Sequence, residues 1–380
     1  MSTHSLRSAR VLTTAVLALA LGLTACAREN DDERSAHDGP SHASEPTEAA
    51  LAGAAWLEGE LRDGVLFNRQ YKIPDHSTTV ELAYALMAVD EDSAAIEEIS
   101  RALADGVDAY ASPGEDVYAG STAKLVSFAA DTGADPHAFG GEDLVAQLEE
   151  RTADDGATAG RIGDQSQYGD YANSFGQAWA VRGLALADSE EAEAARDFLL
   201  QQQCAEGFIR LYFAEPKDAD QTCDGAGAAP EPVDTTALAY VLLHDLAADD
   251  PVLAEALDRG IAYITSQQAA DGSFSGGSGT AVVPNSNSTG LAGWALHLAG
   301  EDDAAAQAAT WVRARQLGQC EGPLAEDAGA IGFDAAAVTA AGRRGLTKKT
   351  EYQWRLATAQ ALPALLATPE GAAEAPCPTS

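Results

Sequence analysis

One phrase of sequence recurs along this chain: a residue that can cap a helix, followed by a run of helix length with almost no polar face. In residues 284–298, PNSNSTGLAGWALHL, Asn287 or Ser288 can accept hydrogen bonds from the open amides of a first helical turn. The residues that follow are mainly Gly, Ala, Leu and Trp, so a helix formed here must be buried on nearly every side. Similar phrases occur at residues 76–89, 120–130, 172–186, 233–246 and 351–366.

The spacing of these phrases indicates an internal repeat. The residue four positions after each cap serves as a register mark, which gives Leu82, Leu125, Gln177, Leu238, Leu291 and Leu356. Successive marks are 43, 52, 61, 53 and 65 residues apart. A unit that recurs with loops of variable length is typical of repeat folds, in which each unit buries its apolar face against its neighbours.

Segments of a second kind lie between the apolar phrases. Residues 251–268 place Leu253, Leu257 and Ile261 on one face of a helix and charged side chains on the other, which is the pattern of a surface helix. Similar segments lie at about 51–61, 93–108, 141–151, 190–203 and 302–316. This alternation predicts six inner helices shielded by six outer ones, closed as two concentric rings. Because period-two strand patterns are essentially missing from the sequence, we expect an all-α fold.

Residues 259–274, RGIAYITSQQAADGSF, resemble the QW motif of squalene-type cyclases, with Gln267 or Gln268 beside Gly272 and with Phe274 in place of the usual Trp. Residues 197–208, DFLLQQQCAEGF, are a weaker copy. From about residue 50 to 367 the chain therefore resembles the α/α toroids of terpene cyclases and protein prenyltransferases. The resemblance implies an (α/α)6 barrel in which the motif ties an outer helix to the next turn, and it implies less about activity.

The catalytic motifs of those enzymes are incomplete in this sequence. The resemblance to cyclases that protonate an alkene implies an Asp-x-Asp-Asp motif at the start of an inner helix, and the matching stretch is PVDTTA, residues 232–237. Asp234 matches the middle acid, but Pro232 and Thr235 replace its partners. An Asp before Thr-Thr is typical of a helix cap, which is the role we expect for it. The sequence therefore favours a binding protein, and a terpene cyclase or prenyltransferase-like enzyme centred on Asp234 is the alternative.

Two phrases are also similar to the α domains of transcobalamin and intrinsic factor: Ser288 to Ala292, and Val233 to Thr235 before an Ala/Leu helix. This resemblance implies a bound corrinoid, which those proteins hold between a toroid and a smaller β domain. Only a short tail follows residue 367 here, so the resemblance implies a partner that supplies the β domain or a membrane transporter that receives the ligand.

A ligand in the centre of such rings would meet the polar residues at the mouths of the inner helices. Three of these residues, Asn173, Asp234 and Asn287, are also expected as caps, and His76 is typical of a solvated loop residue. The aromatic members are the stronger signal, because core packing does not demand them. The candidate ligand-binding residues are Asp75, His76, Tyr118, Tyr168, Tyr171, Asn173, Gln177, Asp234, Asn285, Asn287, Tyr352 and Trp354.

The start of the chain predicts export. Arg7 and Arg10 precede an apolar run that is too short to span a membrane, and the following Leu-Thr-Ala-Cys is similar to a bacterial lipobox that ends at Cys26. An ordinary secretory signal is the alternative. We expect a signal peptide at residues 1–25, lipidated Cys26 with a tether to residue 48, a toroid at 49–367 and a tail at 368–380. The protein would then lie on the outer side of the cell membrane, attached only by its lipid.

Net charge and cysteines fit an exported protein. The net charge of -36 argues against nucleic acid and against docking on anionic lipid, because both need clustered Lys and Arg. Four cysteines remain after Cys26, and we favour the pairs Cys204 with Cys223 and Cys320 with Cys377. Zinc is the alternative for these thiols, but the sequence contains neither a CxxC pair nor a histidine at ligand spacing, so we predict no metal.

These observations lead to one functional hypothesis with two alternatives. We expect a lipid-anchored toroid that binds an apolar or planar small molecule, either a corrinoid or a polyprenyl compound, in its central cavity. The first alternative is the enzyme centred on Asp234. The second is a surface scaffold that contacts another protein through its acidic outer ring.

Overall fold

The computed structural model describes residues 45–378 apart from 226, 228–230 and 278–281. The expected signal peptide, the lipidation site Cys26 and most of the expected tether lie outside the described residues. Residues 45 onward form one compact unit. None of the helices in this described part of the chain is both long enough and apolar enough to cross a membrane.

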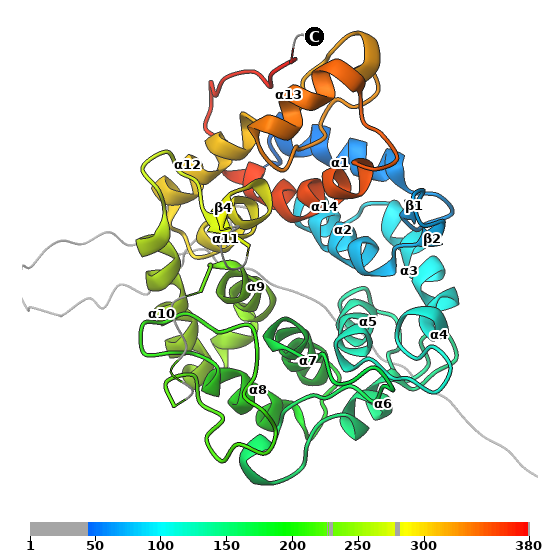
Figure 1. Cartoon of the computed structure of the whole chain (residues 1–380), viewed down its shortest axis with the longest axis vertical. Coiled ribbons are helices and arrows are strands. Elements are labelled where there is room, and N and C mark those ends of the chain that lie inside the picture. The colour runs from blue at the N-terminus through cyan, green and yellow to red at the C-terminus, as the bar shows by residue number, and fades with distance from the viewer. Residues whose placement is uncertain (1–44, 226, 228–230, 278–281, 379–380) are drawn as a thin grey trace, which may run out of the picture. The chain divides into compact units, whose positions relative to one another are not determined.

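Six helices form the inner ring of this unit (Figure 1). Each packs against the next, and the last packs against the first, so that the ring is closed. They are α2 (His76–Val89), α5 (Ala119–Asp131), α7 (Ser174–Leu186), α9 (Asp234–Leu243), α11 (Ser286–Leu298) and α14 (Glu351–Ala361). All six fall within the apolar phrases of the sequence or within one residue of them.

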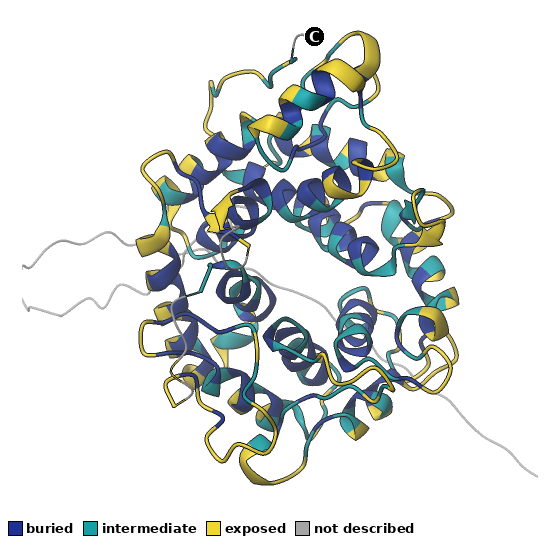
Figure 2. Cartoon of the chain, in the orientation of Figure 1, coloured by how far each residue is buried: buried dark blue, intermediate teal, exposed yellow. Residues whose placement is uncertain are grey.

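The outer ring is formed by helices that alternate with the inner ones along the chain. They are α1 (Glu48–Glu60), α3 (Ala95–Asp105), α6 (Leu144–Glu150), α8 (Ala192–Gln201), α10 (Pro251–Gln267) and α12 (Asp302–Arg313). Figure 2 shows buried residues where the two rings face each other and exposed residues on the outer side of the outer helices. The predicted α/α toroid is therefore confirmed.

Most of the smaller elements lie in the connections and were not predicted. The exception is the 3-10 helix at Leu362–Ala367, in the phrase 351–366 where one continuous helix was expected; the α-helix there ends at Ala361, shortly before Pro363. Two hairpins have strands of only two residues each, too short for a period to be visible: β1 (Phe67–Asn68) pairs with β2 (Ile73–Pro74), and β3 (Ser275–Gly276) pairs with β4 (Val283–Pro284). The other small elements are the helices α4 (Val107–Tyr110) and α13 (Ala335–Arg344), and the 3-10 helices η1 (Gly156–Thr158), η2 (Leu246–Ala248), η4 (Gly322–Leu324) and η5 (Leu362–Ala367).

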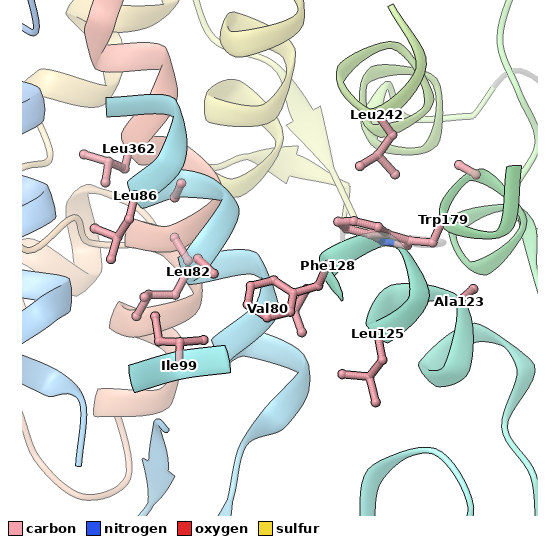
Figure 3. Close-up of a cluster of buried hydrophobic side chains, with 14 of the residues drawn as sticks. Val80, Leu82, Leu86, Ile99, Ala123, Leu125, Phe128, Trp179, Leu242 and Leu362 are labelled. Atoms are coloured by element: carbon pink, nitrogen blue, oxygen red, sulfur yellow. The ribbon is translucent and has the colours of Figure 1, made fainter. Parts of the chain in front are cut away.

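The core lies between the two rings. Leu82 and Leu86 of α2 point toward Ile99 of α3 and Leu362 of η5, and all four side chains are fully buried (Figure 3). Truncation of a buried leucine to alanine typically costs about 2–5 kcal/mol, so these contacts are a main source of stability.

One buried polar residue marks the true register of each inner helix. These residues are Thr79, Thr122, Gln177, Thr236, Thr289 and Thr358, all at most 1% exposed. Five of them accept a hydrogen bond from a backbone amide in the preceding loop, donated by Leu66, Ile162, Ile209, Phe274 and Ile331 at 2.9–3.0 Å. The register predicted from leucines is wrong in detail, because these polar residues lie at different offsets from the marks. Leucine occurs on several faces of helices that are apolar all round.

The expected role of the QW-like motif is confirmed, with Gln268 as its glutamine. Its side-chain amide donates to the carbonyl of Gly272 at 3.2 Å and to Ala304 in the next outer helix, α12, at 2.9 Å. A Cβ on Gly272 would meet the backbone of α12 at 2.5 Å, so only glycine permits this approach. Gln203 in the weaker copy makes the equivalent bonds to Gly207 and to α10.

A third copy of this tie closes the ring and was not predicted. Gln316 donates to the carbonyl of Gly329 at 3.0 Å and to Ala49 of α1 at 2.9 Å. The turn at Gly329 thereby joins the last outer helix to the first.

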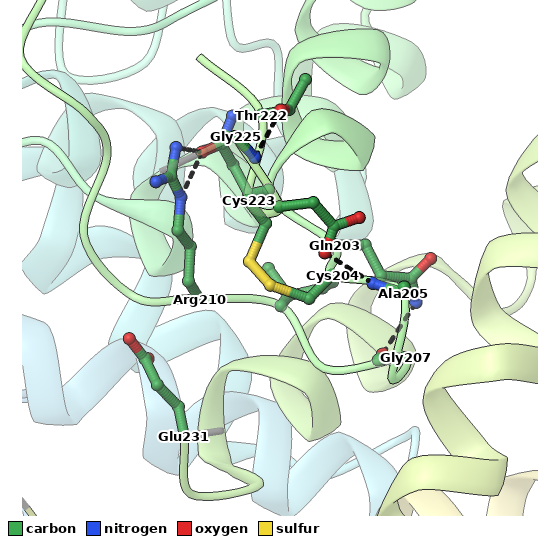
Figure 4. Close-up of a disulfide and its surroundings, with 12 residues drawn as sticks. Gln203, Cys204, Ala205, Gly207, Arg210, Thr222, Cys223, Gly225 and Glu231 are labelled. Carbon is green, nitrogen blue, oxygen red and sulfur yellow. Dashed lines mark hydrogen bonds between the residues drawn. A yellow bond between two sulfur atoms is a disulfide. The ribbon is translucent and has the colours of Figure 1, made fainter. Parts of the chain in front are cut away.

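The two favoured disulfides are both present. Cys204 pairs with Cys223, with Cα atoms 5.0 Å apart, and Cys320 pairs with Cys377, with Cα atoms 5.4 Å apart. Figure 4 shows the first bridge beside Arg210, a buried guanidinium that donates to the side-chain oxygen of Gln202 and to the carbonyl of Gln221. The second bridge attaches the C-terminal tail to the loop after α12.

The helix caps agree only in part with the sequence. Asn173 caps α7 as predicted, by accepting from two amides of the first turn. The cap of α11 is Asn285, which accepts from the amide of Ser288 at 2.9 Å, so the prediction of Asn287 or Ser288 is wrong by two or three residues. Proline at 284 ends the β4 strand directly before this cap.

Candidate functional site

The residue two positions after each register residue faces the centre of the inner ring. These six residues are Glu81, Lys124, Trp179, Leu238, Leu291 and Gln360, and all line one cavity of about 170 Å³. The other lining residues are Tyr84, Phe175, Asp234, Val241, Leu242, Trp294 and Ala359. The internal repeat therefore presents one side chain from every inner helix to the cavity at the same level.

The cavity has a polar side built by α14, α2 and α5. Lys124 donates to Glu81 at 2.6 Å and to the hydroxyl of Ser77 at 3.0 Å, and the amide of Gln360 donates to the other oxygen of Glu81 at 2.8 Å. Burial lowers the pKa of Lys124, but the hydrogen bond to Glu81 and the charges of Glu81, Tyr110 and Asp75 together raise it above its ordinary value. The lysine is therefore charged at neutral pH and is neutralised by its partner.

The opposite side of the cavity is apolar. Trp179 of α7, Leu238 of α9, and Leu291 and Trp294 of α11 supply its surface. In Figure 3 the ring of Trp179 projects away from its own helix and lies beside Leu242. The ammonium of Lys124 lies 5.7 Å from the centroid of the Trp179 ring, at the boundary between the two sides. A hydrocarbon could bury apolar surface on this side without separating Lys124 from Glu81.

A charged network holds the helices together around the phenol of Tyr84. Tyr84 donates to Asp131, and Asp131 accepts from Arg182 through both oxygens at 2.6 and 2.8 Å. Arg182 also donates to Asp245 at 2.8 Å. Burial and the charge of Asp131 raise the pKa of Tyr84 well above its ordinary value, and so the phenol stays protonated. This network joins α2, α5 and α7 to the end of α9.

Asp234 lines the cavity but does not cap its helix. It is the first residue of α9, after Val233 at the cap position, and its carboxylate makes no capping bond to that helix. It accepts instead from the hydroxyl of Ser288 on α11 at 2.7 Å. Burial raises the pKa of Asp234, although the bond from Ser288 opposes this rise. The prediction of a cap is therefore wrong, and a carboxyl that holds its proton more tightly faces an apolar space.

A second cavity of about 250 Å³ lies at the N-terminal ends of α2, α5 and α7. It shares Lys124, Phe175 and Trp179 with the central cavity, so the two adjoin. We refer to it as the mouth cavity. Three residues predicted from the sequence line it: Tyr118, Tyr171 and Asn173.

The remaining predicted residues lie elsewhere. Asp75 and Tyr352 line a separate groove of about 520 Å³ beside the β1–β2 hairpin. His76 is not a loop residue: it begins α2, packs its ring near Tyr110, and has a pKa lowered by burial. Gln177 is fully buried, and its side-chain amide donates hydrogen bonds to the backbone carbonyls of Gly160 and Ala195 in the neighbouring turn and helix.

Four more predicted residues lie outside both cavities. Asn285 is a buried cap, and Trp354 is buried against Gly332. Tyr168 is 67% exposed, and its carbonyl accepts from the hydroxyl of Tyr171. Asn287 is close to the site, because its side chain donates to Gln360 at 2.6 Å.

The sequence did contain a signal for the residues that were missed. Glu81 and Lys124 are isolated charges inside helices that are otherwise apolar, and each occurs two positions after a buried threonine. A charge in that position must find a partner across the ring, so the pair was predictable once the register was known.

No family model and no curated protein matches this sequence. Solved structures share its fold. A protein from Actinoplanes has 16% identity and a TM-score of 0.58, covering 84% of this chain and 98% of its own. The type II terpene cyclase MstE from Scytonema has 15% identity and a TM-score of 0.55, and the match covers 84% of this chain and 96% of the cyclase. The GH76A alpha-1,6-mannanase from Salegentibacter has 12% identity and a TM-score of 0.58, covering 84% and 98%. At these identities the likeness shows the α/α toroid alone.

Proposed function

We propose that this protein binds a small molecule with an isoprenoid-like hydrocarbon part in its central cavity. The observation that carries the proposal is the two-sided cavity, in which an apolar wall faces a polar strip whose charges already neutralise each other. Burying hydrocarbon in such a site makes the binding free energy more favourable, by roughly 25 cal/mol per Å² of apolar surface removed from water. The fold likeness to a terpene cyclase agrees with this ligand class but does not decide it.

A corrinoid does not fit the central cavity. The central cavity of about 170 Å³ is far too small for a corrinoid macrocycle, whereas a narrow prenyl chain can enter it end first from the adjoining mouth cavity of about 250 Å³. None of the residues that line the central cavity is a histidine that could bind cobalt. We therefore favour the polyprenyl class over the corrinoid class.

The test is a titration of the protein from residue 27 onward with geraniol, monitored by tryptophan fluorescence. Two of the five tryptophans, Trp179 and Trp294, line the cavity and should report the binding. We expect saturable quenching, and we expect Leu238→Trp to abolish it by filling the cavity. Leu186→Trp is the matched control, because Leu186 is exposed at the end of α7. A parallel titration with cobalamin should leave the absorbance spectrum of cobalamin unchanged. Equal quenching in Leu238→Trp and in the parent protein would refute binding in this cavity.

A second candidate function is acid-catalysed cyclisation of an alkene by Asp234. One observation favours it: this carboxyl faces the apolar side of the cavity and has a raised pKa. Protonated Asp234 would donate its proton to an alkene carbon, and a base or water would later remove a proton from the cyclised cation. Ser288 is the hydrogen-bond partner of the carboxyl, where cyclases have further carboxyl groups. Incubation with geranylgeranyl substrates would test it: cyclic product that disappears in Asp234→Asn would establish the enzyme.

A further inference from the structure

The mouth cavity adjoins the central cavity and has a different chemistry. Its surface carries the hydroxyl groups of Ser77, Tyr110, Tyr118 and Ser121 and the carboxylate of Asp164. Lys124, Phe175 and Trp179 line both spaces. A single elongated molecule could therefore place its hydrocarbon in the central cavity and its headgroup in the mouth cavity. The chemistry of the mouth cavity indicates what that headgroup is.

Several of these polar groups are free to bind a ligand. Within the described residues, the hydroxyls of Tyr110, Tyr118 and Ser121 form no hydrogen bond. Ser77 accepts from Lys124 and keeps its own proton to donate. A hydroxyl can donate and accept at once, so these groups suit a ligand that does the same at several neighbouring positions.

The charges of the mouth cavity disfavour an anion. Its ammonium group, Lys124, already lies 2.6 Å from Glu81. Asp164 accepts from the amides of Ala119 at 2.8 Å and Tyr171 at 3.0 Å, which leaves lone pairs on a carboxylate that faces the same space. A phosphate would have to displace Glu81 from the lysine and approach Asp164, and like charges at short distance repel.

We infer that the mouth cavity binds an uncharged polyhydroxylated headgroup of the saccharide class, so that the ligand of the whole site is a glycosylated isoprenoid. This inference rests on the proposed function, because the hydrocarbon of the same molecule occupies the central cavity. Tyrosine rings with neighbouring carboxylate and hydroxyl groups satisfy both surfaces of a sugar: the ring supports its C–H face and the polar groups bind its hydroxyls.

The test compares three probes with the same ten-carbon chain: geraniol, geranyl β-D-glucoside and geranyl diphosphate. Each is titrated into the protein from residue 27 onward, with tryptophan fluorescence or calorimetry as the measurement. We expect the glucoside to bind at least tenfold more tightly than geraniol, and the diphosphate to bind more weakly than geraniol. A glucoside that binds no better than geraniol, or a diphosphate that binds best, would overturn the saccharide assignment while leaving hydrocarbon binding intact. If none of the probes binds, the proposed function falls as well.

Two conservative variants locate the headgroup. Tyr118→Phe and Ser121→Ala each remove one free hydroxyl, and each should weaken glucoside binding about three- to tenfold, the loss of one net hydrogen bond. Neither should change the affinity for geraniol. Tyr212→Phe is the matched control, since Tyr212 is exposed and lines neither cavity. Equal losses for geraniol and the glucoside in Tyr118→Phe would mean a structural role for this tyrosine and would contradict the assignment.

Discussion

Replacing Gly329 by alanine should destabilise the toroid more than the size of a methyl group suggests. Gly329 has a φ of +97°, in a region that residues with a side chain rarely adopt. Its Cβ would lie 2.0 Å from the carbonyl oxygen of Ala52 and 2.5 Å from the carbon of the same group. Both atoms belong to the backbone of α1 and cannot rotate away. The turn that carries Gly329 would have to separate from the first outer helix.

The magnitude follows from two costs. A residue with a side chain in a disfavoured backbone conformation costs about 1–3 kcal/mol. Forcing a methyl group into a packed interface costs about 1–3 kcal/mol more. We therefore expect Gly329→Ala to lower the free energy of unfolding by about 2–6 kcal/mol, the sum of these two costs.

Urea denaturation followed by far-UV circular dichroism measures this loss. The matched control is Gly371→Ala, where φ is +73° but the added Cβ would meet nothing within 4 Å. The control carries only the backbone cost of about 1–3 kcal/mol, so Gly329→Ala should have the lower transition midpoint by the additional cost of the contact with α1. Equal midpoints would show that the contact with α1 does not contribute to the closure of the ring.

Further predictions concern the cavity, the disulfides and the N-terminus. Lys124→Met should cost about 1–3 kcal/mol in urea denaturation because it leaves Glu81 short of a donor, and the double variant Glu81→Gln/Lys124→Met should recover most of the loss. A double variant no more stable than Lys124→Met would contradict this. Asp234 has a folded pKa above its unfolded value of 3.8, so the stability it contributes is full below that pH and is lost as pH rises through the folded pKa. Asp234→Asn should therefore be more stable than the parent at pH 7 and lose this advantage toward pH 3, and a difference independent of pH would exclude the raised pKa. Removing the Cys320–Cys377 bridge should cost about 1 kcal/mol more than removing Cys204–Cys223, because it closes 57 residues against 19, and thermal unfolding of the two paired serine variants measures this. The reverse order would contradict the chain-entropy explanation. Cys26→Ser should move the protein from the membrane fraction to the soluble fraction on cell fractionation, because it removes the lipid attachment site, and retention in membranes would refute lipidation at Cys26.

The fold could be predicted because it depends on pattern, whereas the site depends on register. Alternation of all-round apolar and one-faced helices is visible in the sequence and requires two layers. Which face of an inner helix points to the centre is decided by Thr236 or Thr289 binding a loop amide, and no periodicity distinguishes such a threonine from its neighbours. The cavity residues Leu238 and Leu291 follow only once that bond is known.

Distance along the chain explains the other failures. Gln268 and Gly272 are four residues apart and were found as a motif, but 13 residues separate Gln316 from Gly329, so the third copy of the tie was not recognised. The partner of Asp234 is Ser288, 54 residues away, and a cap is what the local sequence alone suggests for such an aspartate. In each case the deciding contact is non-local.

The tie from Gln316 and Gly329 to α1 has a consequence for how this protein unfolds. Open solenoids fray from terminal repeats, whose outer faces must be made polar to keep them soluble. A ring in which the last unit grips the first has no terminal repeat, so no unit can leave without exposing the apolar faces of two neighbours. Partial unfolding is thereby penalised at every position around the circle. The protein should lose its helices in one cooperative step, a useful property for a binding site to which every inner helix contributes one side chain.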